Sequence, residues 1–144
     1  MNQTTLLKNE QTTHDWYVAS AKGKVLGQFA VEVARALMGR GNPNFTPNAD
    51  NGNFVVITDV EGLVVTRNKA EKKIYAFHTG YFGGLNEYTF ADLQSRHPDR
   101  ILMLAVRRMM PKNIQARHQL KRLKMYKGPA HPHQAQAPKP LPGV

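Results

Sequence analysis

The sequence predicts a layered α/β domain with a largely parallel sheet. Short β-rich runs alternate with segments whose apolar residues recur at helical spacing, as expected for that class. The run FVVIT at residues 54–58 is apolar and β-branched throughout, which is typical of a central strand covered on both faces. With 144 residues the chain has the length of one ordinary domain.

The first half contains a strand, a helix and a long loop before that central strand. WYVA at residues 16–19 predicts the strand, and the glycine-containing KGKVLG after it predicts a turn. From Leu26 to Leu37 the apolar residues recur every three or four positions, which predicts a helix that Gly39 ends. Residues 39–53 are rich in Gly, Asn and Pro and predict an exposed, irregular loop.

The middle of the chain predicts two more strands, LVVT at residues 63–66 and KIYAFH at residues 73–78. A glycine-rich loop, TGYFGGL, follows them. Thr89 and Asp92 have the spacing of a capping box and predict a short helix that ends near residue 97.

Two further helices are expected towards the C-terminus. Pro98 suits the first turn of a helix that Pro111 ends, and Asn113 can cap a final helix reaching residue 125. Helical spacing in that final helix predicts two parallel stripes. The apolar stripe comprises Ala116, Leu120 and Leu123, and the basic stripe comprises Arg117, Lys121 and Lys124.

The distribution of prolines predicts a folded body followed by an extended tail. We expect a flexible extension at residues 1–14, a single domain at residues 15–127 and an extended Pro-rich tail at residues 128–144. The tail is rich in proline and poor in large apolar residues. We therefore expect it to have nothing to pack against and to be disordered in the free protein.

The charge of the chain is concentrated in its C-terminal third. Residues 1–99 contain ten basic and ten acidic residues, whereas residues 100–144 contain ten basic residues and no acid, so the net charge of +10 comes from the last part. A surface that needed only solubility would mix the two signs, because like charges repel. This pattern therefore predicts a polyanionic partner, and nucleic acid above all.

The composition of the chain argues against several other classes of protein. There is no cysteine, which removes disulfides and thiolate chemistry and fits a cytoplasmic protein. No apolar run approaches the roughly 20 residues that cross a bilayer, and the polar N-terminus does not resemble a signal peptide. We expect a soluble protein that does not bind membranes.

Candidates for catalysis are weak. The serines, Ser20 and Ser95, lie outside any nucleophile-elbow pattern. The carboxylates Asp50, Asp59 and Glu61 fall in loops or turns, where solvated acids are the usual finding. We expect no catalytic residue.

Candidates for cofactor or metal binding are weak as well. The glycines in GKVLG match neither a Walker loop nor a dinucleotide fingerprint, and are better explained by a tight turn. The histidines His118, His131 and His133 lack neighbouring acids or cysteines that would complete a metal site. We expect neither a cofactor nor a bound metal.

Several segments of the chain resemble, in the same order, those of the bacterial large-subunit ribosomal protein thirteen family. They are DWYVASAKGKVLG, FTPNADNGNFVVI, TRNKAEKKIYAFHTGYFGG, AVRRMMPKN and RLKMYKGPAHPHQAQAP, which together span about residues 15–141. The chain departs from that family at four positions. Gln28 replaces an arginine, Asn48 a histidine, and Arg67 and Arg108 each replace a glycine.

This resemblance implies a three-layer α/β/α domain with an extended basic C-terminal segment that binds 23S rRNA. It implies a cytoplasmic structural component of the large (50S) ribosomal subunit with a role in early ribosome assembly and no enzymatic activity. Its partners would be large-subunit rRNA and neighbouring ribosomal proteins, with mRNA as a further partner, and it would be a monomer within the ribosome.

Basic side chains are the expected contacts with rRNA. Tyr81 and Phe82, in the glycine loop, are candidates for stacking on bases. A DNA- or mRNA-binding regulator and a small nucleic-acid-modifying enzyme remain as alternatives, although no half-site geometry or catalytic group favours either. The expected basic contacts are Lys22, Lys24, Arg40, Arg67, Lys69, Arg107, Arg108, Lys112, Arg117, Lys121, Arg122, Lys124 and Lys127.

Overall fold

A computed structural model of the chain describes residues 8–143. Residues 1–7 of the predicted N-terminal extension lie outside the described part. The main sheet has the order β5-β2-β1-β6, and each neighbouring pair is parallel. A separate antiparallel hairpin joins β3 to β4. The strands are β1 (Trp16–Ser20), β2 (Phe54–Thr58), β3 (Ile74–His78), β4 (Leu85–Thr89), β5 (Leu123–Met125) and β6 (Lys139–Pro140).

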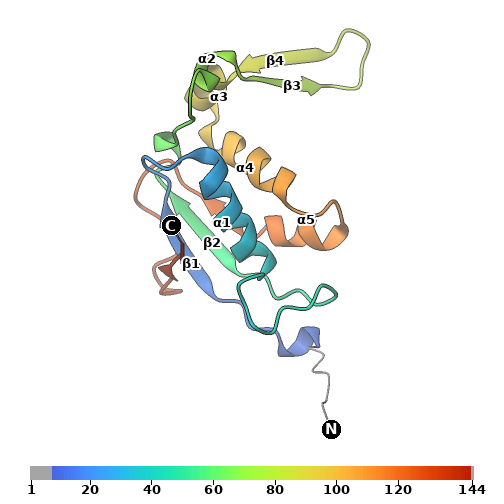
Figure 1. The fold of residues 1–144 in the computed structure, drawn as a ribbon, viewed down its shortest axis with the longest axis vertical. Coiled ribbons are helices and arrows are strands. Elements are labelled where there is room, and N and C mark those ends of the chain that lie inside the picture. The colour runs from blue at the N-terminus through green and yellow to red at the C-terminus, as the bar shows by residue number, and fades with distance from the viewer. Residues whose placement is uncertain (1–7, 144) are drawn as a thin grey trace.

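The helices confirm the α/β class. In Figure 1, α1 crosses the main sheet, and α4 lies between α1 and the β3–β4 hairpin. The helices are α1 (Leu26–Met38), α2 (Lys69–Lys72), α3 (Phe90–Arg96), α4 (Pro98–Met109) and α5 (Ile114–Leu120), with short 3-10 turns at η1 (Asn9–Gln11) and η2 (Val60–Gly62).

The core lies between the sheet and these helices. Along β2, Val55 and Ile57 belong to the core cluster that includes Val33 and Leu37 of α1 and Leu102 of α4. Alternate residues of a strand point to opposite faces. On the other face, Trp16 and Phe54 stack with ring centroids 4.3 Å apart, and His133 of the C-terminal segment lies 5.1 Å from Trp16. Both faces of the sheet are therefore covered, as the run FVVIT predicts.

Three predicted helix ends are confirmed: the caps at Thr89 and Asn113 and the end of α1 at Gly39. The side chains of Thr89 and Asn113 cap α3 and α5 by accepting hydrogen bonds from Asp92 N and Ala116 N. Gly39 ends α1 with a φ of 72°, and a Cβ at this position would overlap the carbonyl group of Asn51. Only glycine meets both requirements without strain.

The prediction of a final helix reaching residue 125 is wrong. The helix α5 ends at Leu120, and β5 then pairs with β2 through hydrogen bonds such as Val55 N to Arg122 O. Leu123 is buried in this strand, and its apolar character and spacing also fit a helix, so the sequence pattern did not distinguish the two conformations. Pairing with the edge of β2 overrides the helical periodicity.

Two further sequence predictions were incomplete. The segment at residues 63–66 is not a full strand, because it forms only a single bridge, Val64 with Val25. The strand β4 was missed, since its sequence LNEYT has three polar residues and little apolar alternation. It forms because the tight turn after β3 brings the chain back beside that strand.

The C-terminal segment packs on the domain, so the expectation that it has nothing to pack against is wrong. The strand β6 pairs with β1, and Leu141 donates its backbone N–H to Val18 O. The Leu141 side chain is buried in the core cluster. Earlier in the same segment, His133 also contacts the domain, because its Nε2 lies 2.8 Å from the hydroxyl of Tyr126.

Replacing Leu141 with alanine is expected to lower the free energy of unfolding by about 2 kcal/mol, because a buried leucine loses its apolar contacts and leaves a cavity. Urea denaturation measures the change. The matched control is Pro142→Ala, since Pro142 is the exposed neighbour. Equal stability of the two variants would mean that the segment does not dock in solution.

Candidate nucleic-acid interface

Four of the predicted basic residues line one groove, which has a volume of about 480 Å³. The walls come from β3, the end of α4, the α4–α5 connection and α5. Phe77, Leu104 and Leu120 contribute apolar surface, and no residue of the lining is acidic. We call this feature the basic groove. Its cations are Arg107, Arg108, Lys112 and Arg117.

The local sequence explains why these cations gather. Arg107 and Arg108 occupy the last turn of α4, where cations complement the negative end of the helix dipole. Pro111 follows in the connection, and Asn113 starts the next helix three residues after Met110. This abrupt corner places Lys112 and Arg117 beside the end of α4.

The positive charges of the basic groove are not neutralised by ion pairs within residues 8–143. All four side chains are exposed, and none forms a salt bridge within residues 8–143. Burial raises the pKa of the Tyr75 hydroxyl above its usual value, and the charge of Arg108 partly opposes this shift. Arg108 therefore adds a positive potential beside the hairpin.

A second group of predicted cations surrounds one end of the main sheet. Lys22 and Lys24 follow β1, and Lys127 follows β5. Parallel strands end at the same edge of a sheet, so these three exposed side chains lie at its carboxyl edge. Asp59, after β2, also lies there and accepts a hydrogen bond from Ser20 Oγ at 2.9 Å. This edge is therefore less purely basic than the groove.

The other predicted cations are dispersed. Lys121 is the C-cap of α5 and Lys124 lies on β5, so Arg117, Lys121 and Lys124 do not form the single helical stripe that the sequence suggests. Arg40 follows α1, and Lys69 begins α2. Arg67 has a φ of 56°, so the backbone keeps a left-handed conformation that favours glycine.

Arg122 differs from the rest of the predicted set because it is used inside the protein. Its guanidinium group lies 2.6 Å from Asp50 Oδ2 and donates a second hydrogen bond to Oδ1 at 3.0 Å. It also donates to Gly52 O at 2.9 Å and lies over the Phe54 ring. Its charge is therefore already neutralised.

The sequence did not reveal the residues that hold the loop at residues 39–53 against α5. Gln115 donates to Ala49 O at 3.0 Å, and Gln119, which is buried, donates to Asp50 Oδ1 at 3.1 Å. The two glutamines are four positions apart, and this i, i+4 spacing puts them on one face of α5. That spacing was the only available signal.

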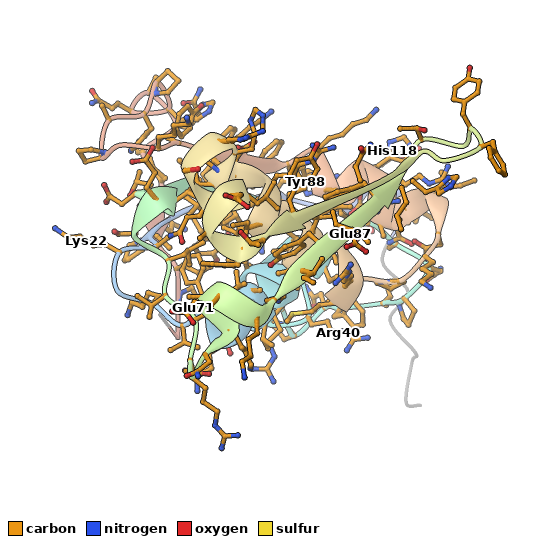
Figure 2. All side chains as sticks on the ribbon, turned by 90° about the horizontal axis from the view of Figure 1, so that it is seen from above. Lys22, Arg40, Glu71, Glu87, Tyr88 and His118 are labelled. Carbon is orange, nitrogen blue, oxygen red and sulfur yellow. The ribbon has the colours of Figure 1, made fainter. Side chains whose placement is uncertain are left out.

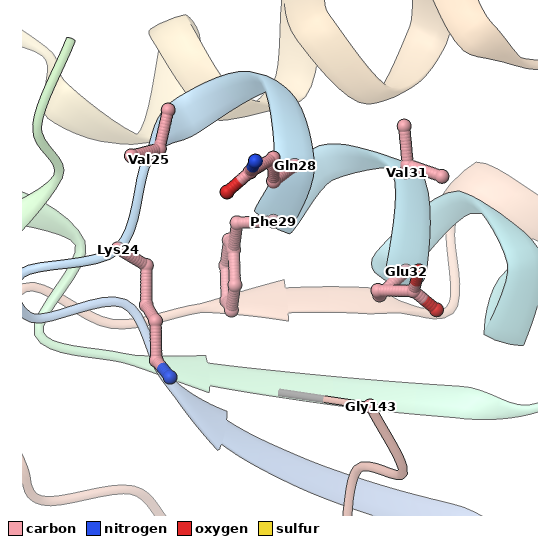
Figure 3. A pocket seen from close by; sticks show the side chains of 7 residues that line it. All are labelled: Lys24, Val25, Gln28, Phe29, Val31, Glu32 and Gly143. Atoms are coloured by element: carbon pink, nitrogen blue, oxygen red, sulfur yellow. The ribbon is translucent and has the colours of Figure 1, made fainter. Parts of the chain in front are cut away.

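A pocket of about 450 Å³ lies between the start of α1 and Gly143. Figure 3 shows Lys24 and Glu32 on opposite sides of it, with the Phe29 ring between them. One cation and one acid make its charge balanced, in contrast to the basic groove. Within residues 8–143 there is also no cluster of three or more potential metal ligands, and no helix is long and apolar enough to cross a membrane.

The fold and the basic groove define an α/β protein with a surface typical of nucleic-acid-binding proteins. The family model "Ribosomal protein L13" matches residues 14–132, and the chain belongs to this family. It is 45% identical over 141 residues to the large ribosomal subunit protein uL13 of Thermotoga petrophila, covering 98% of this chain and 95% of the relative. It is 48% identical over 138 residues to that of Thermosipho africanus, covering 96% and 93%.

Proposed function

We propose that this protein is a structural component of the large ribosomal subunit that binds 23S rRNA and helps early subunit assembly. The basic groove carries this proposal, because it is a row of exposed cations without an acid in a chain of the ribosomal protein L13 family. The relatives are named as proteins of the large ribosomal subunit.

The groove suits an RNA backbone. Arginine presents a planar fork of donors that matches phosphate oxygens, and a lysine ammonium adds a mobile point charge. The apolar surface of Phe77 and Leu120 can accept the sugar and base edges between phosphates. The cations at the carboxyl edge of the sheet would bind a second segment of rRNA.

The proposed role needs no catalysis. We propose a non-enzymatic protein, present as a monomer in the cytoplasmic ribosome, that contacts rRNA and neighbouring ribosomal proteins. Of the three carboxylates considered for acid–base chemistry, Asp50 pairs with Arg122 and Asp59 accepts hydrogen bonds from Ser20 and Thr58. These contacts give both acids structural roles.

Binding to large-subunit rRNA is expected to depend steeply on salt. Each phosphate contact releases counterions, so about 6–10 contacts would weaken binding by roughly 10³–10⁵ between 50 and 200 mM salt. Filter binding over that range measures the slope. A flat profile would contradict a binding mode based on phosphate contacts.

Co-sedimentation with large ribosomal subunits in high salt separates the ribosomal role from a regulator of mRNA or DNA. A structural component stays with the subunit fraction after a salt wash that strips weakly bound factors. Recovery of the protein only in the supernatant would favour the regulator.

A further inference from the structure

The tip of the β3–β4 hairpin exposes two adjacent aromatic side chains. Tyr81 is 80% exposed and Phe82 is 109% exposed, so neither ring packs against the domain. Figure 2 shows the hairpin reaching past the helices at one end of the molecule. Single exposed apolar residues are common on protein surfaces, but two neighbouring rings at a projecting tip form a distinct feature.

The backbone of the tip holds these rings away from the body. Gly80 and Gly83 have φ values of 94° and 71°, on either side of the two aromatic residues. Gly84 N donates to Tyr81 O at 3.0 Å, and Thr79 N donates to Gly84 O at 2.9 Å. A Cβ on Gly84 would overlap the Thr79 hydroxyl, so this closed turn requires glycine there. The rings are presented by an ordered turn that needs little rearrangement to bind a partner.

The two faces of the hairpin show that the tip is the free part. Tyr75, Phe77 and Tyr88 point to the face that packs on the domain. Ile74 and Leu85, on the opposite face, are 58% and 56% exposed. Phe77 still contacts Tyr88 and Arg100, whereas the rings of Tyr81 and Phe82 make no ring contact with any other residue within residues 8–143.

The tip is continuous with the basic groove. Ala76 and Phe77 form the hairpin wall of that groove, and Tyr81 follows Phe77 by four residues. At about 3.3 Å per residue in a strand, the two positions are within roughly 13 Å. The loop from Thr79 to Gly84 is itself uncharged. A strand whose phosphates occupy the groove can therefore bring its next bases to the rings.

We propose that Tyr81 and Phe82 form a stacking platform for unpaired nucleobases of an RNA strand whose phosphates lie in the basic groove. This inference rests on the proposed RNA-binding function and adds that the tip selects single-stranded over duplex RNA. Aromatic faces stack on any base, so the platform would discriminate by strandedness and little by sequence.

The test uses the full-length protein with two probes, a 12-nucleotide single-stranded RNA and a 12-base-pair RNA duplex. The variant is Tyr81→Ala/Phe82→Ala, and the matched control is the ring-preserving swap Tyr81→Phe/Phe82→Tyr. Affinity is measured at several salt concentrations. Thermal melting checks that both variants remain folded, as expected for side chains that are largely exposed.

The alanine variant is expected to lose single-strand affinity by about 5- to 140-fold per stacked base, which corresponds to ~1–3 kcal/mol. Its duplex affinity and its salt slope should stay unchanged, because stacking releases no counterions. The swap should bind like the wild type.

Unchanged single-strand affinity in the alanine variant would overturn the platform while leaving the proposed function intact, and would favour a protein partner for the tip. An equal loss with duplex RNA would also overturn it. A wild-type protein that binds neither probe at low salt would overturn both the platform and the proposed function.

Discussion

Replacing Asp50 with alanine is expected to lower the free energy of unfolding by about 2–3 kcal/mol, which is more than the loss expected for Leu141→Ala. The carboxylate joins the loop at residues 39–53 to α5 and to the turn before β5 by accepting hydrogen bonds from Gln119 and Arg122. Its removal leaves a largely buried guanidinium group without its counter-ion. The side chains are 16% and 25% exposed, and this residual contact with water keeps the effect below that of a fully buried pair.

Urea denaturation at neutral pH measures this change. The matched control is Glu87→Ala, which removes an exposed acid on β4 and should change stability by no more than about 0.5 kcal/mol. A loss as small as that of the control would show that the Asp50–Arg122 pair adds nothing to stability.

The Asp50 contribution should also depend on pH. Burial by itself raises the pKa of the Asp50 carboxyl, but hydrogen bonds from Arg122 and Gln119 and the charge of Arg122 outweigh it, so the pKa lies below the ordinary value of 3.8. The folded state therefore binds a proton less readily than the unfolded state. The stabilisation is complete above pH 3.8 and is lost as the pH falls through the folded-state pKa. The stability difference between wild type and Asp50→Ala should shrink as the pH falls from neutrality to below 3.8. A constant difference would contradict this.

The parts of the fold that were predictable are those with strong local signals. The continuous run of β2 and the caps at Thr89 and Asn113 specify their elements within a few residues. The parts that were not predictable depend on distant pairing. Nothing in the sequence of Leu123–Met125 distinguishes the end of a helix from a strand, because only the free edge of β2 decides it. The same holds for Lys139–Pro140, which becomes a strand by pairing with β1.

The candidate site was predictable in charge but not in shape. The absence of acids after residue 99 already located the cations on the last third of the chain. It did not show that Arg107, Lys112 and Arg117 share a groove with Phe77, because β3 meets α4 and α5 only in the folded protein. It also could not distinguish Arg122, which pairs inward with Asp50, from its exposed neighbours.

The second large prediction follows from the proposal that the basic groove is the main rRNA-binding surface. Replacing Arg107, Lys112 and Arg117 together with glutamine removes three exposed charges and places a good helix former at the two helical positions, so the fold should be preserved. If each side chain contacts one phosphate, the salt slope should fall by about 2–3 units, and affinity at 0.1 M salt should fall by roughly 10²–10³-fold.

Salt-dependent filter binding of large-subunit rRNA to this triple variant is the most direct measurement. The matched control replaces Lys8, Lys72 and Arg96 with glutamine, which removes the same charge from exposed residues outside the groove. We expect the slope of the groove variant to fall by about 2–3 units and that of the control to fall by less than about 1 unit. An equal loss in the two variants would contradict the account, because binding would then depend on net charge and not on the groove.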